Sequence, residues 1–340
     1  MSDEIKLLFI WQPKDELIQH LENALSDLNR IQFVIPPDFE EKTLMKFASD
    51  ANIIMGWRPT LTILENAPEL SLFINPGAGI QNLVEMFREL NQKRSVTLIN
   101  NHGNAYFTAQ HGVGILLALM NRIVPYHNQM AGGGWRENVT LVHSITLRNR
   151  NVGLLGYGAV NQQIHRLLSG FDLEFSILRR DWIKQAKTLP SVANKYNIDQ
   201  LEKFLKWTDT LIISVPLTNL TKGLIRTREL ELLGSNGIIV NLARGLVVDQ
   251  ESLYHACKDK TIHGAAIDVW YEYNPEPDED NREFPYTFPF HELDNVVLSP
   301  HRAASPFNDL RRWDDVIENI RRFALGRTDY LNVVSLDDEY

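Results

Sequence analysis

Short apolar runs alternate along this chain with segments whose apolar residues recur at helical spacing. Of all features of the sequence, this alternation restricts the possible folds most. Apolar runs at 5–11 and 31–36 flank a segment, 16–28, whose apolar residues recur at helical spacing. Further apolar runs follow at 53–56, 72–76 and 96–100. Parallel strands need a crossover between them, usually a helix, so the pattern predicts a parallel sheet covered by helices.

A second series of strands and helices begins at Asn151, after a long helix expected at 104–122. Its later apolar runs lie at 211–215, 237–241, 264–269 and 295–298. With 340 residues, 44% of them hydrophobic, the chain is long enough to bury two cores. The sequence therefore predicts an α/β fold with two doubly wound parallel-sheet domains.

A last helix is expected after residue 304. Ser305 suits its N-cap, Pro306 its first helical position and Gly326 its end. We expect this helix to return to the first domain.

Composition argues against several classes of protein. A formal net charge of -9 and a pI near 5.6 argue against nucleic-acid binding, which needs an excess of basic residues. Cys257 is the only cysteine, so the chain can form no intrachain disulfide. This cysteine content fits a reducing compartment. The N-terminus does not resemble a signal peptide, and the longest apolar run, 113–120, is too short to span a bilayer. We expect a cytoplasmic protein that binds no nucleic acid, membrane or metal.

A glycine turn follows the apolar run at 152–155 and precedes a helical segment. Gly156 and Gly158 fit the first two glycines of the dinucleotide fingerprint, whereas Asn161 stands at the third. The expected cofactor contacts in this turn are Gly156, Tyr157, Gly158, Ala159 and Val160. The alternative is a glycine turn that binds no ligand.

Arg179 and Arg180 lie where an acidic residue would bind the ribose 2′-hydroxyl of NAD, about 20 residues after the glycines. Two guanidinium groups suit a 2′-phosphate instead, because their charge and fork geometry match it. The pair favours NADP over NAD. The alternative is a solvated strand end.

Three further groups predict hydride-transfer chemistry. Arg244 follows the run 237–241, Asp268 ends the run 264–269, and His301 follows Ser299 and Pro300. An arginine binds a carboxylate through two parallel hydrogen bonds, and a histidine transfers a proton near neutral pH. A structural ion pair between Arg244 and Asp268 is the alternative.

These motifs resemble the D-isomer specific 2-hydroxyacid dehydrogenase family, of the glyoxylate/hydroxypyruvate reductase type. The matching stretches are 75–80, 109–111, the glycine turn, 215–218 with Thr221, 240–245, 264–269 and 299–301. The resemblance implies a Rossmann-type cofactor domain, 104–303, inserted in a flavodoxin-like substrate domain, 1–103 and 304–340. It also implies an active cleft between the domains and a homodimer.

The resemblance assigns roles to individual residues. Arg244 would bind the substrate carboxylate and carbonyl oxygen, and His301 would act as acid and base. Backbone N–H groups of Ala78 and Gly79 would complete the carboxylate site. Further cofactor contacts would come from Val215, Pro216, Thr221 and Ala243, and Asp268 would lie near the nicotinamide.

The chain departs from the family at one catalytic position. Tyr273 stands where a Glu pairs with the catalytic His, five residues after the Asp. Glu272, Glu276 or neither residue would take over this role. Trp57, Trp270, Tyr271 and Tyr273 would form a substrate pocket or pack internally.

Two functions are compatible with these features. One is an NAD(P)-dependent reductase of small 2-keto acids such as glyoxylate or hydroxypyruvate, which the intact Arg244 and His301 favour. The other is a cofactor-sensing binding protein of the same fold, which the missing Glu favours.

Overall fold

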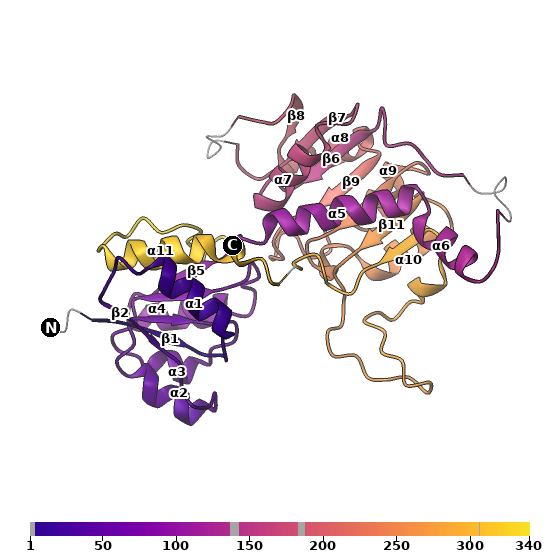
Figure 1. Cartoon of the computed structure of the whole chain (residues 1–340). Coiled ribbons are helices and arrows are strands. Elements are labelled where there is room, and N and C mark those ends of the chain that lie inside the picture. Colours follow the sequence, from indigo (N-terminus) through magenta and orange to yellow (C-terminus); the bar gives the residue numbers. More distant parts are fainter. Residues whose placement is uncertain (1–3, 137–142, 183–187, 306) are drawn as a thin grey trace. The chain divides into compact units, whose positions relative to one another are not determined.

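The computed structural model describes residues 4–136, 143–182, 188–305 and 307–340 (Figure 1). The chain divides into two compact units. The first unit comprises Met1–Asn104 and Pro306–Tyr340, and the second comprises Ala105–Ser305.

The first unit is built on a parallel sheet with the strand order β2-β1-β3-β4-β5. This order is that of flavodoxin-like doubly wound folds. The strands are β1 (Ile5–Phe9), β2 (Ile31–Val34), β3 (Ile53–Met55), β4 (Leu72–Asn75) and β5 (Thr97–Asn100).

Helices cover both faces of this sheet. α1 (Asp15–Ala24) and α11 (Asp314–Ala324) bury their apolar residues in one core, together with Leu7, Phe9 and Ile74 of the sheet. The other core contains residues of α2 (Glu41–Ala48), α3 (Leu61–Glu65) and α4 (Val84–Lys93). Figure 1 shows α11, in yellow, beside α1, where the Arg321 guanidinium bonds the Ala24 carbonyl at 2.6 Å.

The last helix begins later than predicted. Residues 307–309 lie in a turn, a 3-10 turn covers Leu310–Trp313, and α11 then starts at Asp314. Pro306 lies outside the described residues. The predicted end is correct: Gly326 has a φ of 71°, and Arg327 N–H bonds Arg322 O at 2.9 Å, as in a Schellman motif.

The second unit is built on a parallel sheet with the strand order β12-β11-β10-β9-β6-β7-β8. The strand order reverses beside β6, which gives the Rossmann topology and a switch point between β6 and β9. The strands are β6 (Asn151–Leu155), β7 (Glu174–Leu178), β8 (Ala193–Tyr196), β9 (Thr210–Ile213), β10 (Ile238–Asn241), β11 (Gly264–Ile267) and β12 (Val296–Leu298).

Two layers of helices enclose this sheet. α5 (Ala105–Met120) and α7 (Ala159–Leu168) pack in one core. α8 (Leu201–Trp207), α9 (Thr227–Leu233) and α10 (Gln250–Lys258) pack in the other. α6 (Ile123–Ala131) follows α5 and buries none of its residues. The predicted class, two doubly wound α/β domains, is confirmed.

Irregular backbone connects β11 to β12, except for a 3-10 turn at Phe290–Glu292. Within the described residues, no helix combines the length and apolar character needed to cross a membrane.

Candidate active site

The glycine turn lies between β6 and α7, at the switch point of the second sheet. Gly156 has a φ of 81°, and a Cβ there would lie 2.5 Å from the Ser214 carbonyl oxygen and 2.7 Å from Val215 Cγ1. Only glycine fits this backbone without strain. Gly158 is the N-cap of α7, whose first N–H groups, from Ala159 and Val160 onward, have no acceptor within the helix. This narrow turn before a helix N-terminus fits the pyrophosphate of a dinucleotide.

Asn161 stands at the position of the third glycine, and its side chain forms hydrogen bonds there. Its buried Nδ2 lies 3.2 Å from Leu155 O, 2.7 Å from Gly156 O and 3.3 Å from Ile212 O. The amide therefore ties α7 to the glycine turn and to β9. The turn is kept although the fingerprint is imperfect.

Tyr157 points into the second unit. Its Oη lies 2.8 Å from His165 Nδ1, and His165 Nε2 lies 2.8 Å from Ser191 Oγ. Burial raises the pKa of Tyr157 to about 12 and lowers the pKa of His165 to about 4, so both stay neutral at pH 7. The Tyr157 side chain is therefore part of the buried interior of the second unit.

Arg179 and Arg180 follow directly after β7, which ends at Leu178. Arg179 Cζ lies 5.5 Å and Lys195 Nζ 4.9 Å from the centroid of the Trp182 ring. The Trp182 indole N–H donates to Tyr196 O at 3.0 Å and holds the ring in place. The strand end therefore has a positively charged cluster around one aromatic ring.

The turn after β9 is closed by Thr221. Its Oγ1 lies 2.6 Å from Pro216 O and accepts from Thr218 N at 2.9 Å. Val215, which precedes this turn, lies against Gly156 of the glycine turn.

Arg244 lies just after β10. The Asn241 side chain accepts from Ala243 N at 3.1 Å and donates to Arg244 O at 3.2 Å, which fixes the backbone. The guanidinium donates to Ala243 O at 2.6 Å. Among the described residues it forms no ion pair with Asp268 or with any other carboxylate. Desolvation lowers the pKa of Arg244, but an arginine stays charged, so a partly buried positive charge remains available for an anion.

Gly245 lets the Arg244 loop touch the segment after β11. A Cβ on Gly245 would overlap the carbonyl group of Trp270 and contact Tyr271 N. The absence of a side chain therefore allows the two backbones to pack directly together.

Asp268, only 1% exposed, organises the loop that carries His301. Its carboxylate accepts from Ser299 Oγ, from Arg302 N at 2.8 Å and from Ala303 N at 3.0 Å. His111 Nε2 lies 3.4 Å from the same carboxylate. Burial alone would raise the pKa of Asp268, but these donors outweigh burial and hold the pKa below its usual value.

His301 has a φ of 54°, a left-handed conformation that is uncommon for a residue with a side chain. Such backbone persists where its surroundings hold it, here through the bonds of the next two residues to Asp268. The imidazole is exposed. Desolvation lowers the pKa of His301, Asp268 raises it and Arg244 lowers it, with a net pKa below 6.5.

Neither glutamate considered from the sequence contacts His301. Glu272 Oε1 accepts from the backbone N–H groups of Tyr273 and Asn274, both at 2.8 Å. Glu276 is exposed and has no side-chain bond within the described part of the chain. Tyr273 instead faces His301, with ring centroids 5.4 Å apart and an interplanar angle of 61°.

Of the other aromatic residues of the expected substrate pocket, two pack in the second unit and one is exposed in the first. Trp270 is buried against Tyr286 and Phe290, and its indole N–H donates to Ser299 O at 2.8 Å. Tyr271 packs on the core of the second unit. Trp57, in the first unit, is 42% exposed, and its Nε1 lies 3.2 Å from where a Cβ of Gly77 would be.

The loop with Ala78 and Gly79 follows β4 of the first unit. Asn75 Nδ2 donates to Gly77 O at 2.6 Å and to Gly79 O at 3.0 Å, and Asn100 Nδ2 donates to Ala78 O at 3.0 Å. The loop carbonyls are therefore bonded. The N–H groups of Ala78 and Gly79 donate to no acceptor in the described part of the chain.

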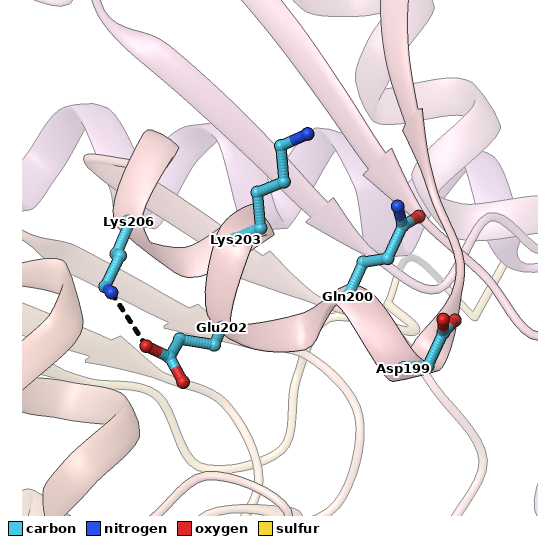
Figure 2. A pocket seen from close by; sticks show the side chains of 5 residues that line it. All are labelled: Asp199, Gln200, Glu202, Lys203 and Lys206. Atoms are coloured by element: carbon cyan, nitrogen blue, oxygen red, sulfur yellow. Dashed lines mark hydrogen bonds and ion pairs between the residues drawn. The ribbon is translucent and has the colours of Figure 1, made fainter.

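A surface hollow of about 420 Å³ lies elsewhere, over α8 and the 3-10 turn before it. Figure 2 shows its polar lining, with Glu202 bonded to Lys206. Glu202 also bonds Arg228 at 2.8 Å. None of its lining residues belongs to the strand ends described above, and the hollow has no feature of a substrate site.

The second unit matches a known family. The model of the D-isomer specific 2-hydroxyacid dehydrogenase NAD-binding domain matches residues 113–303. The chain belongs to this family.

Similar proteins support this family assignment. Glyoxylate reductase of Pyrococcus furiosus is 32% identical over 273 residues, which is 78% of this chain and 76% of the relative. Glycerate dehydrogenase of Methylorubrum extorquens is 27% identical over 78% of this chain and 79% of its own. A family member from Xanthobacter autotrophicus, solved with NADPH, has the same fold, with a TM-score of 0.77 and 23% identity. The match covers 99% of this chain and 100% of that structure's chain.

The dehydrogenase is therefore an NAD(P)-dependent oxidoreductase that interconverts 2-keto and 2-hydroxy acids. Of the two functions considered from the sequence, the enzyme is the correct one. Its NAD(P)-binding domain contains the glycine turn and the strand ends with Arg244, Asp268 and His301.

Sequence reasoning about the dehydrogenase missed two supporting residues. Ser299 donates to Asp268, so its Oγ accepts from His111 Nε2, 2.8 Å away. Both residues belong to motifs that resemble the family, at 109–111 and 299–301, but their mutual contact joins α5 to β12. In the sequence, the one signal for His111 and Ser299 was that they belong to those motifs.

Proposed function

We propose that Arg244 binds the substrate carboxylate and carbonyl oxygen, and that His301 donates the proton when a 2-keto acid is reduced. The observation that carries this proposal is the partly desolvated guanidinium of Arg244, which no described carboxylate neutralises. It follows β10, at the same edge of the sheet as the end of β12, after which His301 lies. NAD(P)H supplies the hydride when bound. As the carbonyl oxygen gains negative charge, Arg244 stabilises that charge and the His301 imidazolium gives its proton to the oxygen.

Ala78 and Gly79 are proposed to complete carboxylate binding through their backbone N–H groups. The support lies within the first unit: the side chains of Asn75 and Asn100 hold the loop carbonyls, which leaves these two donors for an anion. In this proposal residues 104–303 form the cofactor domain, whereas 1–103 with 304–340 form the substrate domain.

The pH dependence of reduction tests how His301 is held. Reduction needs the imidazolium, and the pKa of His301 lies below 6.5, because desolvation and Arg244 outweigh Asp268. We expect kcat/KM for keto-acid reduction to be high at low pH and to fall as pH rises through a midpoint below about 6.5. Glu272→Gln and Glu276→Gln should leave this midpoint unchanged. A midpoint well above 6.5 that moves down in either variant would identify that glutamate as the partner of His301.

A preference for NADPH over NADH is proposed from Arg179 and Arg180. Lys195 adds a further positive charge, since it shares the Trp182 ring with Arg179. Such a cluster suits a 2′-phosphate, which carries more charge than a hydroxyl and accepts several hydrogen bonds. Asp268 is proposed to lie near the nicotinamide, and the glycine turn, Val215, Pro216, Thr221 and Ala243 to line the rest of the cofactor site.

Replacing Arg179 with Asp should erase or reverse this preference. The change removes a charge-assisted pair worth about 1.5–3 kcal/mol and adds repulsion, so kcat/KM with NADPH should fall about tenfold or more. Kinetics with both cofactors measure the ratio. Arg228→Asp is the matched control, since Arg228 is an exposed arginine of the same unit that pairs with Glu202. Equal kcat/KM for both cofactors in the parent enzyme would contradict the preference.

Small 2-keto acids such as glyoxylate and hydroxypyruvate are the proposed substrates. The support is the likeness to the glyoxylate reductase of Pyrococcus furiosus and the resemblance to the glyoxylate/hydroxypyruvate reductase type. The test follows NADPH absorbance with these two acids and with a bulky phenyl-substituted keto acid. Turnover of the two small acids is expected, and turnover of the phenyl acid alone would refute this substrate class.

The enzyme is proposed to act in the cytoplasm as a homodimer. The one cysteine is buried and fits a reducing compartment. α6 leaves Ile123, Val124 and Met130 exposed, with Trp135 shortly after it, and such a patch suits a subunit contact. Light scattering gives the molar mass that tests the dimer.

A further inference from the structure

The segment after β11 directs Tyr273 toward His301 and Glu272 away from it. The backbone N–H groups of Tyr271 and Glu272 both bond Pro285 O, at 3.3 and 3.1 Å. Glu272 then turns its carboxylate onto the N–H groups of the two residues that follow. The local turn thus places a phenol where the family has a carboxylate.

The O–H group of Tyr273 donates a hydrogen bond to no described residue. Its Oη accepts from Trp270 N at 3.4 Å, a long and weak bond, and its own O–H has no protein acceptor in the described part of the chain. The side chain is 52% exposed, although its ring packs edge-on against His301. The hydroxyl can therefore reach a ligand without losing an existing bond.

Two charged residues of the candidate site, Arg244 and Asp268, act on this hydroxyl. Burial raises the pKa of Tyr273, the Trp270 N–H and Arg244 lower it, and Asp268 raises it, with a net pKa above 10.0. The phenol is therefore neutral and protonated at physiological pH. Arg244, His301 and Tyr273 are therefore three side chains that can donate hydrogen bonds.

We propose that Tyr273 is a catalytic residue that donates its phenol O–H to an oxygen of the 2-keto acid, beside Arg244 and His301. The inference rests on the proposed function of those two residues. A 2-keto acid presents three oxygens, two on the carboxylate and one on the ketone, and each of them accepts hydrogen bonds from donors of this kind. During reduction the hydride adds to the keto carbon, and the C=O π pair moves to oxygen, which takes the proton of His301. Tyr273 keeps its own proton and stabilises the charge on the substrate.

Tyr273→Phe tests this role because it keeps the ring against His301 and removes only the hydroxyl. Binding of oxalate, an unreactive mimic of a 2-keto acid, is measured by calorimetry with saturating NADPH. The Kd of oxalate is expected to rise about tenfold, and kcat/KM for keto-acid reduction to fall about tenfold or more, as for a lost hydrogen bond to a charged group. The Kd of NADPH and the Tm should stay unchanged.

Tyr286→Phe is the matched control, since Tyr286 packs on Trp270 and its Oη lies 3.3 Å from His291 Nδ1, outside the proposed site. It should change neither oxalate binding nor turnover. Oxalate Kd and kcat/KM of Tyr273→Phe within about twofold of the parent would overturn the role of Tyr273. A parallel loss of NADPH binding or of Tm would overturn it as well, because the hydroxyl would then be structural. Failure of the parent enzyme to bind oxalate or reduce any keto acid would instead refute the proposed function.

Discussion

His301→Asn is expected to lower kcat for keto-acid reduction by about 10²- to 10⁴-fold, the usual contribution of a general acid. Asparagine is chosen because it tolerates the left-handed backbone that His301 adopts, so the loop on Asp268 should persist. The amide side chain cannot supply a proton near neutral pH. Steady-state kinetics with a keto acid and NADPH measure the effect.

The cofactor affinity and Tm of this variant should match the parent. His291→Asn is a suitable control, since His291 stacks on Phe284 in the same unit, with ring centroids 4.3 Å apart, away from the site. A variant that keeps kcat within about tenfold of the parent would show that His301 is not the acid.

Arg244→Lys is expected to damage catalysis although the charge is kept. A lysine is a point charge and cannot form the paired hydrogen bonds of the guanidinium with a carboxylate. Both KM for the keto acid and kcat should worsen, and kcat/KM should fall by more than about tenfold, a loss above roughly 1.4 kcal/mol. NADPH affinity should stay nearly intact.

Arg226→Lys provides the comparison, because the Arg226 side chain is exposed and donates to Gly223 O at 2.9 Å, outside the site. That variant should keep full activity. If Arg244→Lys retains more than about a tenth of kcat/KM, Arg244 does not contact the substrate as proposed.

Some elements were beyond prediction from local sequence. β8 has exposed Asn194 and Lys195 at its centre, so it lacks the apolar run that identified the other strands. It forms because it pairs with β7 at the edge of the sheet, a contact that the local sequence does not encode. The late start of α11 was also not predicted: Asp309, not Ser305, caps the 3-10 turn at Leu310–Trp313 by accepting from Arg311 N at 3.1 Å, and α11 follows that turn.

The glycine turn shows how a departure from a motif is compensated. A third glycine allows a helix and a strand to pack closely, and Asn161 stands at its position in this chain. The structure replaces that packing with three hydrogen bonds from one buried amide. Their acceptors lie in β6, the turn and β9, and only the folded sheet brings them together.

The sequence by itself determined the class of fold and the edge of the sheet along which the candidate residues lie. Strands that alternate with helices form parallel sheets, and the carboxyl ends of parallel strands lie along one edge. Residues that directly follow such strands, Gly156, Arg244 and Asp268 among them, therefore gather there whatever their side chains are. Tertiary structure alone decided which side chain faces His301. The rotation of a turn depends on distant contacts, here Pro285 O and the close approach of Gly245 to Trp270, and these direct Tyr273 toward the imidazole and Glu272 away from it.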